Sequence, residues 1–510
     1  MSTLHLSQLS VHLTSNSKAR STLSLRMSTP KPRQRGAIRP LGVMDRYMLV
    51  RANTGRPQAL IHVVTYPEDA LPSRQFLEAR VAELQERLPM LYCRVVGADT
   101  NRPGFALNSA PWAAKSIVQD GFFAATPGTE LDEATAVLRD QLARFEARDP
   151  TEPMWAVTRV TGGPADDRAY LVVTVSYLIA DSRAVERLTR ALTAPDIAYV
   201  APEEWNAPTR FDDTFSLRPS ARFIAPVFYR EMVLPRLPKA IQAKLRKEDP
   251  WPGTRVDRSP LVCGSGILAA SIPPPMVARL RDQAKKHHVG SLHAVYKMAF
   301  TAAIWAVFLS KDAGAHRIIG ATARDDRRPE LGHSAMTHNY VQSPEYDTRV
   351  GGSVGFWAAA RQLGDYLRSG TTAAEARMTL GLLNHIPDPE VDCAAPDFDP
   401  SAPTGWERFF IERSTSPTPF RNSFAVTNLG VSELPEGARD QLWGQSASPF
   451  APVYNVQLVE HAGGVRMTSV FCEGAAVTTA QTRLVHAMWE HILARVAEGA
   501  GSKTLAELAR

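Results

Sequence analysis

Cysteine is scarce in this chain of 510 residues. The four cysteines, Cys93, Cys263, Cys393 and Cys472, lie far apart, and no two of them are separated by only two residues. This spacing offers neither a zinc site nor a disulfide framework, so we expect no metal and a reducing compartment. A phosphate-binding glycine loop and the dinucleotide-binding glycine pattern after a strand are also missing.

Long hydrophobic runs and a sustained excess of one charge are missing too. No window approaches 18 uncharged apolar residues, so no membrane-spanning helix is expected. The first 44 residues contain seven basic and no acidic residues, whereas the rest of the chain contains 51 basic and 52 acidic residues. The net charge of +6 therefore belongs to the N-terminal tail. Because the body has no basic stripe, we expect no nucleic-acid partner.

The tail, residues 1–36, is rich in Ser, Thr and basic residues, and we predict that it does not join the core. Met27 is an alternative start. The segment "HLSQLSVHL" places Leu6, Leu9 and Leu13 on one helical face. It resembles an N-terminal peroxisomal targeting signal, with His5 where Lys or Arg is usual. Cytoplasmic and peroxisomal locations are both predicted, with a mitochondrial presequence and a chance match as further alternatives.

The body is too long for a single core and shows helix and strand signals in both halves. "ALIHVVTY" and residues 169–175 indicate strands, and helices are expected after Ser73 and over 183–192. In the second half we expect a buried helix after Ser291, a hairpin over 454–471 and a terminal helix over 478–497. The expected division is an N-terminal lobe (37–195), a Pro-rich crossover (196–262) and a C-terminal lobe (263–510). The predicted fold class is α/β, with two similar sandwich lobes.

The stretch "AYLVVTVSYLIADSRAVERL" is the most informative one. A β-branched run ends at Ser176, and an amphipathic helix begins just after Asp181. Asp181 is at a helix N-cap position, where a carboxylate contributes about 1 kcal/mol of stability.

Four segments occur in an order that resembles the fungal alcohol acetyltransferase branch of the chloramphenicol-acetyltransferase-like acyltransferases, which include condensation domains. They are "RPLGVMDRYMLVR", "SYLIADS", "SLHAVYKMAFTAAIWAVF" and "RNSFAVTNLG". The resemblance implies two lobes with a tunnel between them, acyl-CoA as co-substrate and a small hydroxyl-bearing acceptor. It further implies that Asp181, the motif aspartate, forms an ion pair with an arginine and holds the loop in shape. Arg324 and Arg94 are the candidate partners.

The sequence departs from this family at Tyr177, where the resemblance implies a catalytic histidine. A phenol with a pKa of about 10 is seldom a base at neutral pH, so we expect Tyr177 to orient a substrate through its hydroxyl. His338 in "AMTHNYV" is our candidate for the missing base. His385 and the helix-end pair His287 and His288 are less favoured.

Three further residues are predicted to bind substrate: Ser176, Asn428 and Arg324. Asn428 also fits a strand-end turn with Gly430. The acidic residues Asp388, Asp392, Asp397 and Asp399 lack the ligand spacing of a calcium loop and are expected to be solvated.

The predicted function is acyl transfer from acyl-CoA to a hydroxyl of a small alcohol, secondary metabolite or glycolipid, by a monomeric protein. One alternative is an impaired relative that binds acyl-CoA or a small molecule without transfer. Another is amide-bond condensation with carrier-bound substrates.

Overall fold

The computed structural model describes residues 38–510 apart from short gaps. These gaps are residues 124–127, 163–166, 230–232, 246–248, 255–258, 313, 391–398, 400, 417–418, 450–451 and 500–502. The predictions made for the tail, Cys393, Asp392 and Asp397 therefore lie outside the described residues.

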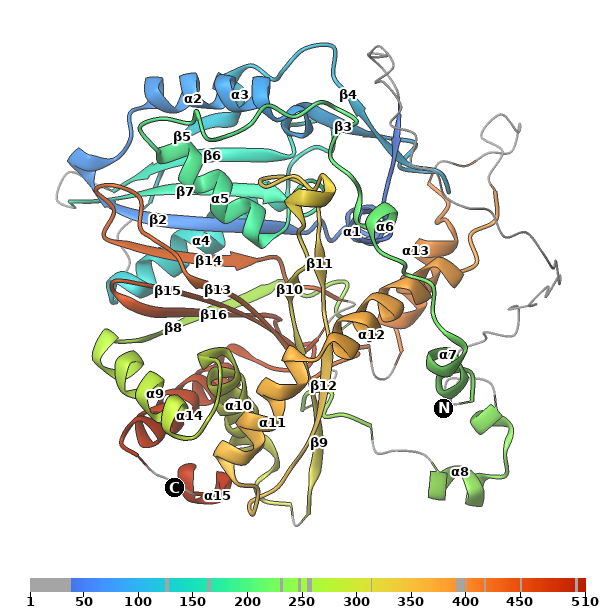
Figure 1. Cartoon of the computed structure of the whole chain (residues 1–510). Helices are drawn as coiled ribbons and strands as arrows, with labels where there is room; N and C mark the ends of the chain where they lie inside the picture. Colours follow the sequence, from blue (N-terminus) through green and yellow to red (C-terminus); the bar gives the residue numbers. More distant parts are fainter. Residues whose placement is uncertain are drawn as a thin grey trace.

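The first lobe contains a five-stranded sheet with the order β14-β2-β7-β6-β5 (Figure 1). β2 is largely apolar, with His62 and Thr65 as buried polar exceptions, because both of its faces are covered. Leu60 and Val64 of β2 pack in the cluster that includes α2 and α5, whereas Ile61 and Val63 pack with α4 on the opposite face. The elements of this lobe are β2 (Ala59–Pro67), β5 (Val118–Phe122), β6 (Trp155–Thr161), β7 (Arg168–Ser176), α1 (Val43–Asn53), α2 (Arg74–Arg87), α3 (Ala114–Ile117), α4 (Glu130–Glu146) and α5 (Ser182–Thr193).

The edge strand β14 (Asp440–Gln445) comes from the far end of the chain. It pairs antiparallel with β2, from Asp440 opposite Thr65 to Gln445 opposite Leu60. The predicted division assigns this segment to the second lobe, but in space it completes the first sheet. The indole of Trp443 donates to the carbonyl of Leu458 in the second sheet, at 3.1 Å, so this strand also joins the two lobes.

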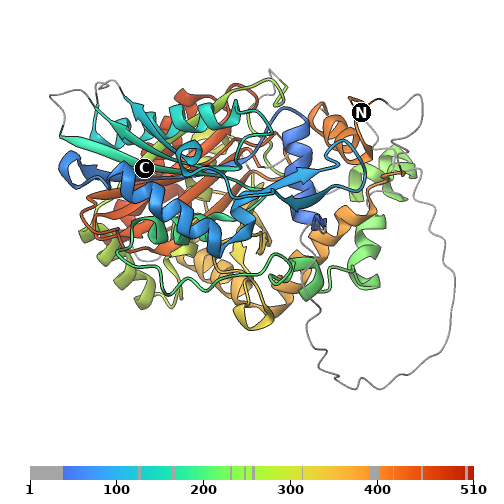
Figure 2. The same ribbon diagram turned by 90° about the horizontal axis from the view of Figure 1, so that it is seen from above.

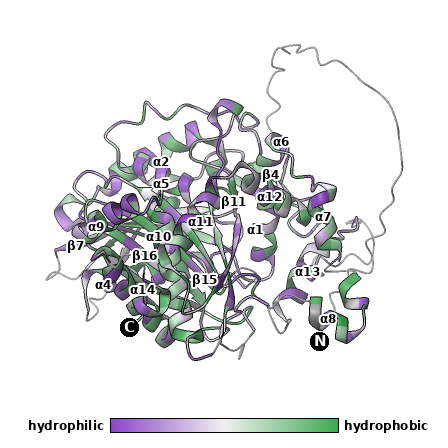
Figure 3. Cartoon of the chain, turned by 60° about the horizontal axis from the view of Figure 1, so that its bottom comes forward, coloured by the Kyte–Doolittle hydropathy of each residue, from purple (hydrophilic) through white to green (hydrophobic). Residues whose placement is uncertain are grey.

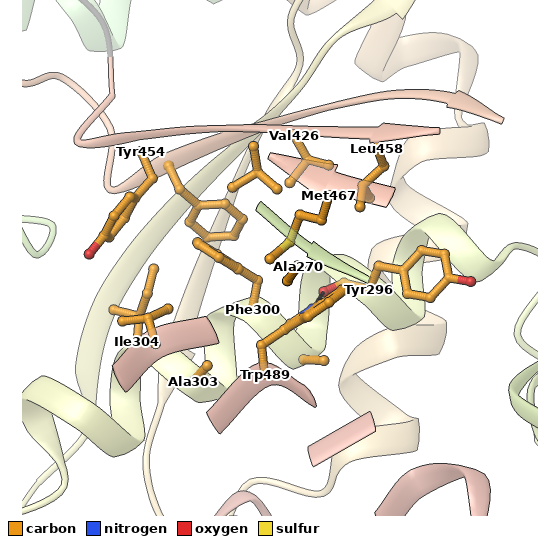
Figure 4. Packing of buried hydrophobic residues seen from close by; sticks show 14 of the residues in the cluster. Ala270, Tyr296, Phe300, Ala303, Ile304, Val426, Tyr454, Leu458, Met467 and Trp489 are labelled. Carbon is orange, nitrogen blue, oxygen red and sulfur yellow. Dashed lines mark hydrogen bonds between the residues drawn. The ribbon is translucent and has the colours of Figure 1, made fainter. Parts of the chain in front are cut away.

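The second lobe contains a six-stranded sheet with the order β12-β9-β13-β15-β16-β8. Helices α10 and α14 cover one face, where Phe300 and Trp489 meet Val426 and Met467 (Figure 4). The elements are β8 (Ser265–Ile272), β9 (His316–Thr322), β12 (Glu345–Val350), β13 (Phe424–Val431), β15 (Tyr454–His461), β16 (Gly464–Cys472), α9 (Pro274–Lys286), α10 (Leu292–Ile304), α11 (Phe356–Arg368), α14 (Thr479–Ala497) and α15 (Leu505–Leu508).

Two small sheets and a group of peripheral helices complete the part of the chain that the structure describes. Helix α1 stands beside α13, as the view from above shows (Figure 2). The small sheets are β1 (Arg39–Pro40), β4 (Gly104–Leu107) and β3 (Cys93–Val96), and β10 (Arg324–Asp325) with β11 (Val341–Gln342). The helices are α6 (Phe211–Thr214), α7 (Ala221–Phe228), α8 (Lys239–Leu245), α12 (Gly370–Gly381) and α13 (Gly405–Ser414).

The structure confirms the predicted α/β class and the elements read from local patterns. Ser73 and Asp181 cap α2 and α5 through their side chains, and the hairpin turns between His461 and Gly464. Within the described ranges, one helical span, Leu292–Leu309, is long and apolar enough to cross a membrane, but 72% of it is buried inside the protein, as in a core helix.

Candidate active site

The motif loop, residues 176–181, leaves β7 and turns sharply before α5. The hydroxyl of Ser176 accepts a hydrogen bond from the backbone of Leu178 at 3.3 Å, and Ile179 donates to the carbonyl of Ser176 at 3.1 Å. The backbone of Tyr177 donates to the carbonyl of Gln58, just before β2. The predicted substrate-binding residue Ser176 thus stabilises the turn that presents Tyr177.

Asp181 is fully buried and holds three groups at once. Its carboxylate accepts from the backbone of Ala184 at 2.9 Å and from that of Tyr340 at 3.0 Å. It also pairs with the guanidinium of Arg327 at 2.9 Å. A buried carboxylate needs this compensation because desolvation otherwise makes its charge costly. Asp181 therefore joins the motif loop to the segment that follows β10.

The predicted ion-pair partners of Asp181, Arg324 and Arg94, are both wrong. Arg324 lies in β10 and pairs with Asp326 at 3.6 Å, while Arg94 is exposed on β3. Arg327 takes the position because its guanidinium lies under residues 334–338, where it donates to the carbonyl of Ser334 at 2.6 Å. Arg324 lies near the surface beside α11, and its role in substrate binding stays a prediction.

The structure brings His338 to the motif loop. Its backbone donates to the carbonyl of Ile179 at 2.6 Å and accepts from Asp181 at 3.3 Å. The residue adopts a φ of 65°, in the left-handed region that is uncommon for residues other than glycine. Strain of this kind persists where the surroundings over-determine it, which is common at functional sites.

A chain of hydroxyls connects the imidazole of His338 to a carboxylate. Nδ1 lies 2.8 Å from the hydroxyl of Thr337, which lies 2.7 Å from that of Ser334, which in turn lies 2.6 Å from Glu203 Oε1. With Glu203 ionised, Ser334 donates to it, and the Thr337 hydroxyl can in turn donate to Ser334, which leaves Nδ1 of His338 as the donor to Thr337. In a neutral ring Nε2 then carries the free lone pair. Within the described part of the chain, Nε2 is buried and has no partner.

Electrostatics keep this imidazole neutral. Burial lowers the pKa of His338 well below its usual 6.5, and the positive charges of Arg39 and Arg327 lower it further. The ring of His338 is therefore neutral at neutral pH.

Tyr177 is in the opposite condition. Burial raises the pKa of its phenol far above 10, and the charge of Asp181 adds to this, against a smaller effect of Arg51. The hydroxyl stays protonated at any physiological pH. It can therefore donate or accept a hydrogen bond, but it does not act as a phenolate base. Tyr177 nevertheless keeps some solvent exposure, unlike Leu178, Ile179 and Ala180 beside it.

Two residues of α1, Arg51 and Asp45, were not among the predicted site residues. Arg51 is 1% exposed, donates to the carbonyl of Ala447 at 2.9 Å, and leaves its Nε without a partner. Among the described residues it forms no ion pair. Asp45 receives one hydrogen of the Asn339 amide at 3.1 Å, and the same amide donates to the carbonyl of Tyr177 at 2.6 Å. Burial raises the pKa of Asp45 to about 6. The charged residues Asp45 and Arg51 within the mostly apolar "VMDRYMLVR" were the available signal.

The other predicted residues lie elsewhere. The side-chain oxygen of Asn428 accepts from the backbone of Gly430, whose φ is 69°, as expected for a strand-end turn. His385 is exposed, and His287 stacks on Trp357 with ring centroids 4.5 Å apart. These residues are not brought to Tyr177 by any contact in the described regions.

The acidic loop is less solvated than expected at one position. Asp388 lies 3.4 Å from Arg46 and accepts from the backbone of Gly405 at 3.0 Å. Across the described ranges, no group of three or more His, Cys, Asp or Glu residues is arranged to hold a metal ion.

Comparison with known proteins identifies the fold. No protein-family model and no curated protein matches the sequence. Among solved structures, the trichothecene 15-O-acetyltransferase TRI3 from Fusarium sporotrichioides is 13% identical, with 91% of this chain and 95% of that chain covered at a TM-score of 0.62. The condensation domain of the monacolin K polyketide synthase MokA is 12% identical, covering 92% and 99% at 0.61. Polyketide synthase associated protein 5 from Mycobacterium tuberculosis is 13% identical, covering 91% and 100% at 0.55.

The chain therefore has the two-lobed fold of condensation domains and chloramphenicol-acetyltransferase-like acyltransferases. At this level of identity the comparison concerns the fold, and function has to come from the site.

Proposed function

We propose that this protein transfers an acyl group from acyl-CoA to a hydroxyl of a small alcohol, secondary metabolite or glycolipid. The observation that carries the proposal is Nε2 of His338, which has no partner among the described residues. The backbone of His338 is hydrogen-bonded to the motif loop, and its Nδ1 is joined to Glu203 by a chain of hydroxyls. An imidazole oriented in this way is the usual proton acceptor for an attacking hydroxyl. The likeness to an O-acetyltransferase fold supports the same reaction.

The proposed reaction divides the roles that one histidine combines in the resembled family. Nε2 of His338 takes the proton of the acceptor hydroxyl while its oxygen attacks the thioester carbonyl. A carbon–oxygen bond forms, and the carbonyl electrons move onto the oxygen. When that intermediate collapses, the carbon–sulfur bond breaks, and the sulfur leaves as the CoA thiol after taking the proton from the imidazolium of His338.

Tyr177 and Arg51 suit the oxyanion of the intermediate. The phenol stays protonated, so it can donate to a developing negative charge. The guanidinium of Arg51 is buried and has an unused Nε donor, and its positive charge lowers the pKa of Tyr177. Removing one such donor typically costs about 10²–10³-fold in kcat. The substitution of tyrosine for histidine thus moves the base to His338 and leaves a donor in its place.

One observation favours the alternative of a binding protein without efficient transfer. A phenol with a strongly raised pKa cannot replace the missing base, so transfer depends on His338 alone.

The two proposals are separated by release of free thiol from a series of acyl-CoAs with candidate alcohols. We expect turnover by the wild type and a loss of roughly 10²–10⁴-fold in kcat for His338→Ala. Thr337→Val, which removes the partner of Nδ1, should lower kcat less and leave KM unchanged. His385→Ala, an exposed histidine, is the matched control and should behave as wild type. Acyl-CoA binding by thermal shift without any thiol release would support the binding protein instead.

A further inference from the structure

Helices α7 and α8, in the segment between the lobes, are rich in apolar residues and yet exposed. α7 has the sequence "ARFIAPVF", yet none of its eight residues is buried. A helix that is apolar on most sides is normally covered by protein. Both helices stand off from the two sheets, and α8 carries a hydrophobic turn on the outside (Figures 1 and 3).

Exposed apolar side chains are concentrated in this segment. Five of the twelve large hydrophobic residues that are exposed in the described regions lie within residues 224–245. They are Ile224 (37% exposed), Phe228 (56%), Tyr229 (41%), Ile241 (43%) and Leu245 (50%). Single exposed hydrophobics are normal on a protein surface, whereas a group of this size marks an interaction site.

The charge of the segment is equally one-sided. Residues 217–245 contain six basic residues and a single acidic one, Glu231. Arg218, Arg222, Arg236 and Lys239 are exposed. Aromatic and aliphatic side chains bordered by Lys and Arg are typical of a helix that lies in the interface of an anionic bilayer.

We propose that α7 and α8 form a surface that docks this protein on an anionic lipid membrane, independently of the proposed acyl transfer. Two other occupants are disfavoured by charge. A second copy would bring the same positive surface against this one, and residues 1–36 of the chain itself hold six basic and no acidic residues. An anionic bilayer can bury the apolar side chains of this surface and attract its basic side chains.

The rest of the protein holds this surface in a defined place. The backbone of Ser220, which caps α7, donates to the sulfur of Met378 in α12 at 3.3 Å. The guanidinium of Arg377, also in α12, lies 3.8 Å from the ring centre of Phe215. The start of α7 is therefore anchored to α12, so docking through α7 would set the orientation of the molecule on the membrane.

The test is sedimentation of the full chain with vesicles of phosphatidylcholine, with and without phosphatidylserine. We expect binding to the anionic vesicles only, weakening as salt rises. Phe228→Ser with Leu245→Ser should lower the partition coefficient at least about tenfold. Arg222→Glu with Lys239→Glu should lower it at least about 20-fold. Leu484→Ser, at a residue of α14 that is 60% exposed, is the matched control and should bind as wild type.

Equal sedimentation with both kinds of vesicle, or an equal loss in the Leu484→Ser control, would overturn the proposal. So would a dimer in light scattering that dissociates in the Phe228→Ser and Leu245→Ser variant, since the surface would then belong to a second copy. Acyl transfer is measured separately in detergent-free buffer, so a failure of docking says nothing against the reaction.

Discussion

Removing the carboxylate of Asp181 should destabilise the protein severely. The side chain is fully buried, pairs with Arg327 at 2.9 Å and caps α5 through Ala184. Loss of one partner of a buried pair costs about 3–5 kcal/mol, because the remaining charge is left without compensation. Asp325, at 3.2 Å from Arg327, still offers some compensation, so the lower end applies. The lost cap adds about 1 kcal/mol.

We therefore expect Asp181→Ala to lose about 4 kcal/mol of unfolding free energy, a large share of the roughly 5–15 kcal/mol typical of proteins. The apparent melting temperature should fall by roughly 10 °C, at about 2–4 °C per kcal/mol. Asp181→Asn keeps an acceptor for Ala184 and should be less damaging. Asp181→Leu combined with Arg327→Met removes both charges and should recover part of the loss.

Thermal unfolding of these variants, followed by circular dichroism, tests the reasoning. A melting temperature of Asp181→Ala within about 2 °C of wild type would refute the structural role of the pair. If that variant also lost all activity, Asp181 would act in the chemistry and not in the architecture of the loop.

The remaining predictions concern Tyr177, Asp45 and the tail. Tyr177→His should raise thiol release because the loop and Asp181 already stand in place, and Tyr177→Phe should lower it roughly 10²–10³-fold; no change in either would remove Tyr177 from the reaction. The raised pKa of Asp45, about 6, gives stability that is present below about pH 4 and lost as the pH rises through 6. Asp45→Asn should therefore gain about 2–3 kcal/mol relative to wild type between pH 4 and 7 in urea unfolding, and a constant difference would contradict this. A chain that starts at Met27 should melt as the full chain does, and a reporter fused behind residues 1–26 should reach peroxisomes unless it carries Leu6→Asp; a diffuse reporter would exclude that signal.

Features set by neighbours in the sequence were predictable, and features set by distant contacts were not. The caps at Ser73 and Asp181 follow from local hydrogen bonding, and the hairpin follows from alternation around Gly463 and Gly464. The choice of Arg327 over Arg324 depends on how the loop after β10 folds under residues 334–338, which the spacing of arginines in "ARDDRRP" does not encode.

The same limit applies to the site. His338 could be proposed as a candidate base because few histidines lie in a plausible segment, and its role as a base stays a prediction. The chain of hydroxyls beside His338 could not be predicted, because Glu203 and Ser334 are 131 residues apart in the sequence. Arg51 was not predicted because the local pattern indicates only a helix. Its contact with Ala447, just after β14, shows that it is buried, and it forms no ion pair with any residue that the structure describes.

The position of β14 constrains how the chain folds as it leaves the ribosome. β2 and β7 are complete early, but the strand that closes the edge of β2 is made about 260 residues later. At roughly 5–20 residues per second, the edge of β2 stays open for many seconds of translation. An unpaired apolar edge of this kind attracts other strands and invites aggregation. A fragment that stops before β14 should therefore be insoluble by itself, and supplying the second half in trans should rescue it.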